Sequence, residues 1–577
     1  MKIRLAKTSG FCMGVRRAME MALAEANKGN ARFFTFGPLI HNRQVLELLE
    51  SKGVRSVVDI SSLDKGTILI RAHGIPPEQR KQLKNSGLRL LDGTCPRVAK
   101  VQAIIRYHTK KGYTPVIIGE KDHAEVIGLV GYGLGQAKVI NHPSDVENLP
   151  DMEKICVVAQ TTQDERIFSE MTGRIIERFP DALIFNTICD ETHSRQDEVR
   201  SLARHVDGMV VVGGYHSGNT RRLAQISRDA GIPTFHVETE KELDKEKFSY
   251  MGVVGIIAGA STPNWMITNV VKKMENIRSR KDIFIGRLIK HTLKFLLLSN
   301  LLVAMGAFSL SYAITVLTGS RGKVIFPLLA FFYVYAMYVL NRFLERGASA
   351  YNDPERGGFH KKHRFFQILT GIAATIGALI FSYHMGMAVY SAMAGLCILG
   401  IIYSFPIVPF SRKYLWKYSR IKDIPGSKTF SESFAWASVI VLLPLLKYGW
   451  AEWAASVVSF YFVLSISYVR SAFLDILQMQ GDMIVGAETL PIVLGEKRTI
   501  RLLKMIIVST ALLLLISPVL NLVSPFAFLL LLCLIPLAIC LQIYDENRIY
   551  QGPRIEYLAE GGFILAGIMA LIWQGVT

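Results

Sequence analysis

Hydrophobic and polar positions follow two different patterns along the chain, and the change comes near residue 284. Before that point, short apolar runs rich in Val, Ile and Phe are separated by amphipathic segments with many charged residues, which is typical of strands connected by helices. After it, long apolar stretches recur to the end of the chain. The pattern predicts an α/β part followed by a helical membrane part.

The first part is predicted to fold as an α/β trefoil of three small units, because strands separated by helices favour parallel sheets. The predicted strands lie near residues 3–6, 32–36, 54–58 and 67–71 in the first unit, 115–119, 138–141 and 155–160 in the second, and 209–213, 234–237 and 253–257 in the third. The units are expected to surround one central site. We place this domain at residues 1–280, a basic linker at 281–291 and an all-α membrane domain at 292–577.

The second part contains about nine apolar stretches of roughly 20 residues, the length needed to cross a hydrocarbon core of about 30 Å. They lie near residues 293–316, 324–341, 366–384, 387–408, 430–447, 452–470, 502–520, 523–543 and 557–574. Basic residues gather in alternate loops, at 342–364, 412–428 and 497–498. The positive-inside rule then predicts a multi-pass protein of the inner (cytoplasmic) membrane, with these loops and the N-terminal domain in the cytoplasm.

Charge and cysteine content narrow the class of protein further. The net charge is +19, and much of the basic excess lies beside the apolar stretches. That location favours anionic lipid headgroups over nucleic acid as the partner. The seven cysteines lack the dense pairing of a secreted disulfide scaffold, which indicates a reducing compartment for the first part. The charged beginning of the chain predicts no signal peptide.

Three cysteines, Cys12, Cys95 and Cys189, each follow a strand-like run and precede a predicted helix. A helix amino end favours thiolate over thiol, and a thiolate is a ready metal ligand. If the three units converge, three thiolates would hold one metal centre with a position open to substrate. Zinc is one option, with Glu125 as a general base, and an iron-sulfur cluster is the other. The number of ligands does not decide between them.

Other polar residues also fall at predicted strand ends, which ordinary core residues do not. Ser217, Asn219 and Ser261 lie at predicted helix amino ends, where backbone N–H groups bind phosphate. His41, His73 and His123 could donate hydrogen bonds to the same anion. These positions predict an anion site beside the metal centre.

Nine short motifs occur together in this part: Gly10-Phe11-Cys12-Met13-Gly14-Val15, His41-Asn42, Ala72-His73-Gly74, Asp92-Gly93-Thr94-Cys95-Pro96, His123-Ala124-Glu125-Val126-Ile127-Gly128, Gln160-Thr161-Thr162, Thr187-Ile188-Cys189, Ser217-Gly218-Asn219-Thr220 and Gly259-Ala260-Ser261. In this combination residues 1–280 resemble the 4-hydroxy-3-methylbut-2-enyl diphosphate reductase (LytB) family, which completes the non-mevalonate isoprenoid pathway.

The resemblance implies a 4Fe-4S cluster held by Cys12, Cys95 and Cys189. It implies that Glu125, helped by Thr161, relays a proton so that the substrate hydroxyl leaves as water, and that two electrons lead to isopentenyl or dimethylallyl diphosphate. The diphosphate would be held by His41, His73, His123, Ser217, Asn219 and Ser261. An electron donor such as ferredoxin or flavodoxin is implied as a partner.

The membrane part resembles the UbiA superfamily of intramembrane prenyltransferases in its spans and in its polar residues beside the membrane. Asn341, Glu345, Asp475 and Asp482 match the family's two acidic motifs in position or charge, and Lys428 ends a stretch, 422–428, that resembles a diphosphate-binding loop. Arg342, Ser349 and Gln478 stand where aspartates are usual. The resemblance implies Mg²⁺ as a cofactor and transfer of a prenyl group to an aromatic or other lipid acceptor.

The sequence thus predicts a fusion of an isoprenoid diphosphate reductase with a prenyltransferase-like membrane domain. Two alternatives stay open. The membrane part would be a non-catalytic anchor if its acidic motifs had drifted, and the first part would be a zinc hydrolase if its cysteines held zinc.

Overall fold

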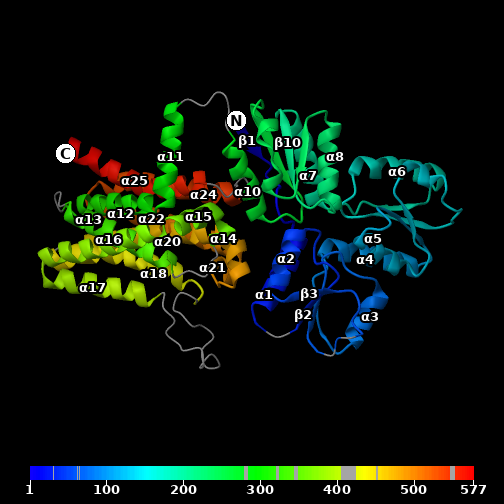
Figure 1. Ribbon diagram of the computed structural model, residues 1–577, viewed down its shortest axis with the longest axis horizontal. Helices are drawn as coiled ribbons and strands as arrows, with labels where there is room; N and C mark the ends of the chain where they lie inside the picture. Colours follow the sequence, from blue (N-terminus) through cyan, green and yellow to red (C-terminus); the bar gives the residue numbers. More distant parts are fainter. Residues whose placement is uncertain are drawn as a thin grey trace. The chain divides into compact units, whose positions relative to one another are not determined.

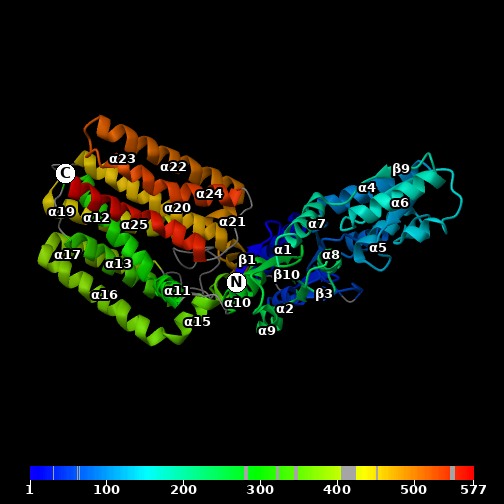
Figure 2. The same cartoon turned by 90° about the horizontal axis from the view of Figure 1, so that it is seen from above.

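The computed structural model describes residues 1–29, 32–61, 63, 65–277, 284–319, 324–343, 349–403, 424–449, 453–545 and 553–577. The chain divides into two compact units, Met1–Lys281 and Asp282–Thr577. Figure 1 and Figure 2 colour the first unit from blue to green and the second from green to red. Of the predicted linker, residues 281–283 lie outside the described residues, and 284–291 belong to helix α11 (Phe284–Leu298).

The N-terminal unit contains three parallel sheets of four strands each, which confirms the predicted trefoil. One sheet has the order β3-β2-β4-β5, with β2 (Phe33–Phe36), β3 (Val54–Val57), β4 (Thr67–Ile70) and β5 (Arg89–Asp92). The next has the order β7-β6-β8-β9, with β6 (Thr114–Ile118), β7 (Lys138–Ile140), β8 (Ile155–Ala159) and β9 (Leu183–Phe185). The last has the order β1-β12-β10-β11, with β1 (Lys2–Leu5), β10 (Gly208–Val212), β11 (Thr234–Val237) and β12 (Val253–Ala258).

The first strand of the chain belongs to a different sheet from the one that we predicted. We expected it in the first unit, but β1 pairs with β12, with Lys2 opposite Val253 and Leu5 opposite Ile256. Strand β12 is almost wholly buried and pairs with β10 along its other edge. Because a buried strand must satisfy the backbone groups of both edges, β12 needs this second neighbour.

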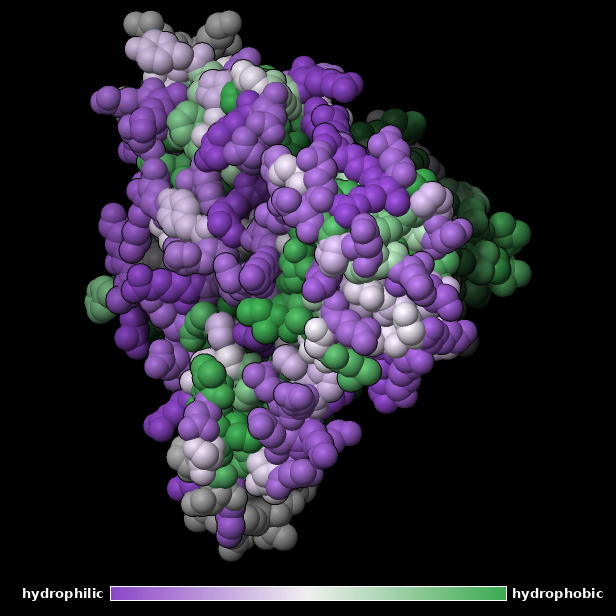
Figure 3. All heavy atoms as spheres, turned by 90° about the vertical axis from the view of Figure 1, so that its right-hand side faces the viewer, coloured by the Kyte–Doolittle hydropathy of each residue, from purple (hydrophilic) through white to green (hydrophobic). Residues whose placement is uncertain are grey.

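Helices cover the sheets and bury their central strands. They are α1 (Met13–Ala26), α2 (Arg43–Ser51), α3 (Pro77–Asn85), α4 (Pro96–Lys110), α5 (Ala124–Val130), α6 (Glu165–Arg178), α7 (Asp190–Ala203), α8 (Gly218–Asp229), α9 (Lys245–Phe248) and α10 (Asn264–Glu275). Every residue of β8 and of β10 is buried, as expected for a parallel sheet covered on both faces. The surface drawn in Figure 3, on the side where α6 lies, is mostly hydrophilic.

The second unit is helical throughout its described residues. After α11 come α12 (Leu301–Leu317), α13 (Ile325–Phe343), α14 (Ser349–Asn352), α15 (Pro354–Lys362), α16 (Arg364–Met385), α17 (Met387–Ile402), α18 (Ser427–Ala437), α19 (Leu443–Tyr448), α20 (Trp453–Val485), α21 (Leu490–Leu494), α22 (Glu496–Val519), α23 (Ala527–Leu530), α24 (Ile535–Asp545) and α25 (Pro553–Val576). A π-helical segment, Ser438–Leu442, joins α18 to α19. In both views α13, α16, α20 and α22 run roughly parallel (Figure 1 and Figure 2).

Each of the nine predicted apolar stretches contains a helix, but fewer of them qualify as spans. In the described part of the chain, seven helices are long and apolar enough to cross a membrane, or eight if a bent pair counts as one span. That pair, His291–Leu298 and Leu301–Leu317, is bent by 82° next to Asn300, whose φ is 64°. Figure 1 shows α11 standing across α12. The remaining stretch corresponds to α17, which has 16 residues and precedes the undescribed residues 404–423.

Helix α20 corrects a second expectation. We expected a loop after residue 470, but α20 continues for 33 residues to Val485. Its second half keeps a buried apolar side, with Phe473 and Ile476 at most 2% exposed. Because this side packs against the rest of the unit, burial favours continuation of the helix beyond residue 470. The acidic residues expected on a loop therefore lie on a buried helix.

Candidate functional sites

The three predicted ligand cysteines occupy equivalent positions in the three sheets. Each directly precedes the first residue of a helix, Cys12 before α1, Cys95 before α4 and Cys189 before α7. Each donates its backbone N–H to the carbonyl two residues beyond the end of the neighbouring strand: Cys12 to Ala260 (3.1 Å), Cys95 to Ala72 (2.9 Å) and Cys189 to Thr161 (2.9 Å). The fold thus presents one thiol from the end of each sheet.

The surroundings of these thiols suit a shared metal centre. A Cβ atom on Gly14 would lie only 2.6 Å from the Cys95 sulfur, so glycine lets α1 approach Cys95 closely. Burial raises the pKa of Cys12 to about 11 and also raises that of Cys95. Burial thus opposes the helix amino ends, because the backbone N–H groups of Val15, Arg97 and Val98 lower the pKa of these thiols. Buried thiols of this kind give up their protons to a bound cation.

Glu125 and Thr161 form a buried pair beside the cysteines. The Thr161 backbone N–H donates to one carboxylate oxygen of Glu125 (2.7 Å), and the Thr161 hydroxyl donates to the other (2.8 Å). Glu125 is 2% exposed, and burial raises its pKa against the opposing effect of these two bonds. Because the Thr161 carbonyl also accepts the N–H of Cys189, one residue links the acid to a candidate metal ligand.

The three predicted histidines face one another. The ring centroids of His41 and His73 are 4.9 Å apart, those of His41 and His123 are 5.7 Å apart, and those of His73 and His123 are 5.4 Å apart. One ring nitrogen from each lies within 4.8 Å of those of the other two. Nε2 of His41 and Nδ1 of His73 are buried without a hydrogen-bond partner. Such orphaned buried nitrogens indicate a site for a polar ligand.

Ser217, Asn219 and Ser261 join the histidines. The Ser261 hydroxyl lies 3.4 Å from that of Ser217 and donates to the His41 carbonyl (3.4 Å). Asn219 is buried, and its Nδ2 has no hydrogen-bond partner. A Cβ atom on Gly218, at the start of α8, would lie 3.7 Å from the His123 ring. The six residues predicted to hold a diphosphate therefore gather in one place.

We expect the stability of the N-terminal unit to fall as the pH falls from about 6.5 toward 4. Burial lowers the pKa of all three histidines, that of His123 to about 4, whereas unfolded histidines titrate near 6.5. Within this window the unfolded chain binds more protons, so protonation favours unfolding. Pulse proteolysis in urea, read from peptides of residues 1–277, should give a lower midpoint at pH 5 than at pH 7.

The matched variants are His123→Asn, which should reduce this pH dependence, and the exposed His142→Asn, which should keep it. An unchanged dependence in His123→Asn would contradict the assignment to the buried ring.

Sequence reasoning missed Arg195, a buried guanidinium near the cysteines. Arg195 is 4% exposed, and its Nη1 donates to the Ala258 carbonyl (3.1 Å). Its charge interacts with Cys12 and Cys189, and burial lowers its pKa. Arg195 lies six residues after Cys189, on the buried side of α7. This spacing could have indicated that its side chain lies near the cysteines.

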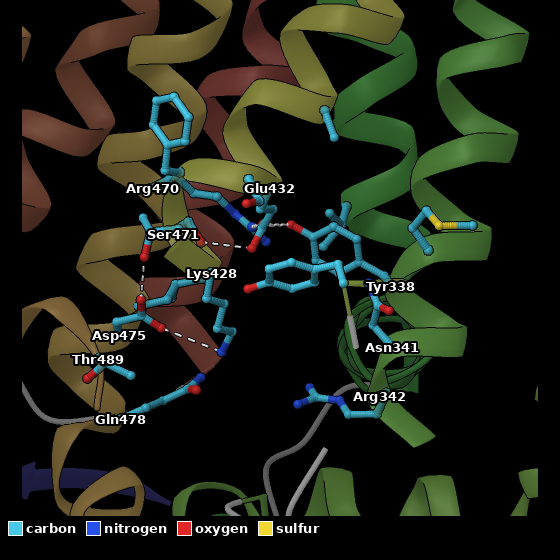
Figure 4. Close-up of a pocket in the computed structure, with 18 of the residues that line it drawn as sticks. Tyr338, Asn341, Arg342, Lys428, Glu432, Arg470, Ser471, Asp475, Gln478 and Thr489 are labelled. Atoms are coloured by element: carbon cyan, nitrogen blue, oxygen red, sulfur yellow. Dashed lines mark hydrogen bonds and ion pairs between the residues drawn. The ribbon is translucent and has the colours of Figure 1, made fainter. Parts of the chain in front are cut away.

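The second unit contains a cavity of 490 Å³ among its helices. Apolar and aromatic residues of α13, α17 and α18 line much of it, and polar residues gather at one end. Figure 4 shows the Lys428 ammonium and the Arg342 guanidinium directed into this polar end from α18 and α13. Lys428 Nζ lies 3.6 Å from an Asp475 oxygen, and the Thr429 hydroxyl donates to the other (2.8 Å).

A charged network lies one helical turn away from Lys428 and Asp475. Glu432 accepts hydrogen bonds from Ser471 (2.9 Å), Arg470 (3.0 Å) and the Tyr338 hydroxyl. Arg470 also donates through Nε to Glu560 (2.8 Å) and through Nη1 to Tyr338 (2.6 Å). Figure 4 shows Glu432, Arg470 and Tyr338 meeting at the cavity wall. Sequence reasoning gave these residues no role, although ionisable residues within apolar spans are a recognised signal of function.

Four of the five residues predicted for the prenyltransferase-like site lie at this cavity. Asn341, at the end of α13, and Lys428, Asp475 and Asp482 all line it. Asp482 accepts a hydrogen bond from Asn352 Nδ2 (3.0 Å). Glu345 lies outside the described residues.

The N-terminal site defines an α/β protein with a cysteine at the end of each of its three sheets, a buried acid and a cluster of three histidines, and comparison with known proteins assigns its family. Residues 3–275 match the family described as LytB protein. The 4-hydroxy-3-methylbut-2-enyl diphosphate reductase of Opitutus terrae is 42% identical over 287 residues, which cover 48% of this chain and 99% of that protein. The chain belongs to the LytB family.

Two solved structures are also similar. The structure of (E)-4-hydroxy-3-methyl-but-2-enyl diphosphate reductase is 40% identical with a TM-score of 0.40, and the match covers 48% of this chain and 100% of that one. A UbiA homolog from Archaeoglobus fulgidus, bound to GPP and Mg²⁺, is 17% identical with a TM-score of 0.37, and the match covers 48% of this chain and 97% of that one.

Proposed function

We propose that the N-terminal unit reduces 4-hydroxy-3-methylbut-2-enyl diphosphate to isopentenyl and dimethylallyl diphosphate. The observation that carries this proposal is Thr161, which binds both oxygens of Glu125 and the backbone of Cys189. A proton donor is thereby fixed beside a candidate electron-transfer centre. The reductases of the same family support this assignment.

The three cysteines fit a 4Fe-4S cluster, because their thiols come from three sheets and Gly14 leaves room beside Cys95. A cluster bound by Cys12, Cys95 and Cys189 would supply electrons and a Lewis-acidic iron. We propose ferredoxin or flavodoxin as the source of these electrons.

The residues of this chain would hold the substrate and deliver protons. The histidines with Ser217, Asn219 and Ser261 would bind the diphosphate, and the orphaned nitrogens of His41 and His73 supply polar contacts for it. The buried Glu125 carboxyl would give its proton to the substrate hydroxyl, which leaves as water. The reaction breaks one C–O bond, forms one C–H bond, and consumes two electrons and two protons.

We expect Cys95→Ser to abolish cluster loading and turnover, because serine replaces a soft thiolate ligand. The measurement is anaerobic reconstitution of the full chain in detergent with iron and sulfide, followed by substrate reduction with a chemical electron donor. Cys156→Ala is the matched control, since Cys156 lies near the start of β8, at the opposite end of the strand from Thr161. Wild-type protein that is colourless, holds zinc and shows no reductase turnover would favour a hydrolase instead.

For the membrane unit we infer binding of an isoprenoid diphosphate and transfer of its prenyl group to an aromatic or other lipid acceptor. The observation that favours this function is the cavity, which joins a long apolar wall to an end bearing Lys428 and Arg342. We place this unit in the inner membrane, with the basic loops and the N-terminal unit in the cytoplasm.

Among the described residues, the two aspartates predicted to hold Mg²⁺ contact other side chains of this unit. Asp475 is held by Lys428 and Thr429, and Asp482 is held by Asn352. We therefore derive no step through Mg²⁺.

The test of the membrane function is transfer from radiolabelled geranylgeranyl diphosphate to a membrane lipid extract by the full chain in nanodiscs. A labelled lipid product would exclude a pure anchor. Neither product nor binding of the labelled donor would support the anchor.

A further inference from the structure

We propose that Glu432 is the proton acceptor of the membrane site, which takes up the proton that the acceptor substrate loses on prenylation. This inference rests on the proposed transfer function of the membrane unit. It adds the residue that takes up the proton released in that reaction.

Glu432 is placed one helical turn from the polar end of the cavity. Lys428 and Glu432 are four residues apart on α18, and Asp475 and Ser471 are four residues apart on α20. The contacts Lys428–Asp475 and Glu432–Ser471 therefore form two successive layers between the same two helices. Four residues of helix rise about 6 Å. With a diphosphate at Lys428, the carbon bonded to it would lie near the Glu432 layer.

Glu432 is the more exposed of the two carboxylates that the network brings to the cavity wall. Its side chain is 23% exposed, whereas those of Arg470 and Glu560 are 6% and 3% exposed. Ser471 holds one carboxylate oxygen, and Arg470 and Tyr338 hold the other. These bonds fix the carboxylate at the wall, which is the positioning that a general base requires.

The buried network carries one more negative charge than positive charge, so it can take up one proton. A single guanidinium, that of Arg470, faces two carboxylates, those of Glu432 and Glu560. A proton on Glu432 would leave Arg470 paired with Glu560 and would remove the excess negative charge. The other titratable groups near Glu432 are Tyr338 on α13, Tyr403 at the end of α17, Asp475 on α20 and Lys428 on its own helix.

The proposed step balances without a further reactant. The bond between the first prenyl carbon and the diphosphate oxygen breaks, and diphosphate leaves with the electron pair toward Lys428. The oxygen or ring carbon of the acceptor forms a bond to the prenyl carbon, and its proton passes to Glu432. Nothing is oxidised or reduced.

The test compares Glu432→Gln with wild type as the full chain in nanodiscs, with radiolabelled geranylgeranyl diphosphate as donor and a membrane lipid extract as acceptor. We expect transfer to fall by about 10²- to 10⁴-fold, with binding of the labelled donor unchanged. Glu432→Asp should keep part of the activity. Glu496→Gln, on the first turn of α22 and outside the cavity lining, is the matched control.

The outcomes separate this inference from the function on which it rests. Wild-type protein that neither binds nor transfers the donor would overturn the transfer function, and this inference with it. Transfer by wild type with equal transfer by Glu432→Gln would overturn only the role of Glu432. Loss of donor binding in both Glu432→Gln and Glu432→Asp would assign the residue a structural role and also overturn the inference.

Discussion

Replacing Glu125 by Gln is expected to lower reductase turnover by about 10²- to 10⁴-fold, the usual contribution of a positioned general acid. Glutamine keeps the size of the side chain, and its carbonyl oxygen can accept one of the two bonds from Thr161. It carries no acidic proton to give to the leaving hydroxyl. The measurement is the rate of substrate reduction by cluster-loaded full chain with a chemical electron donor. The variant must match wild type in iron content and colour. The loss of turnover can then be attributed to proton transfer and not to loss of the cluster.

Two further variants sharpen this prediction. Thr161→Val removes the hydroxyl bond to Glu125 (2.8 Å) but keeps the backbone bond (2.7 Å), so we expect a smaller loss of turnover than in Glu125→Gln. Glu147→Gln, at an exposed glutamate, should behave as wild type. Turnover of Glu125→Gln within a few-fold of wild type would show that the proton comes from elsewhere.

Replacing Arg470 by Met is expected to destabilise the membrane unit by about 3–5 kcal/mol, because it leaves buried charges without their partner. Arg470 is 5% exposed and binds Glu432, Glu560 and Tyr338. The measurement is the unfolding midpoint of the full chain in detergent, read from peptides of the second unit. Arg498→Gln, outside the network, is the control.

A combined variant tests whether Arg470→Met loses stability through unpaired charge or through lost packing. In Arg470→Met with Glu432→Gln and Glu560→Gln, the unpaired carboxylates are gone. We expect the triple variant to recover much of the lost stability, since removing all charges of a buried network costs far less than removing one. A triple variant as unstable as Arg470→Met alone would attribute the loss to packing of the arginine stem.

Local patterns in the sequence were sufficient to predict the strands, the helices and the cysteines at the strand ends. Periodicity reports burial of each segment, and Cys12, Cys95 and Cys189 each sit where a strand-like run meets a helical one. The order of strands in a sheet depends on contacts between distant segments. For that reason β1 was assigned to the wrong unit, although its position along the chain was predicted.

The membrane site shows even more clearly that local sequence patterns do not predict contacts between distant segments. The chain contains Glu432, Arg470 and Glu560 on three helices, and no local spacing relates them. Their meeting depends on how α18, α20 and α25 pack, which hydrophobicity alone does not specify. The end of α20 was misplaced because Asp475 and Asp482 suggested a solvated segment, whereas the packed unit supplies partners for both.

The pairing of β1 with β12 has a consequence for the order of events during synthesis. Residues 2–5 emerge first from the ribosome, yet their partners, residues 253–256, emerge about 250 residues later. The backbone of Cys12 is likewise fixed by Ala260. The sheet therefore cannot close until almost the whole unit has been translated, and such distant pairing folds slowly. The three candidate ligand cysteines are therefore all in place only after this closure, which comes when the first membrane helix is about to be made.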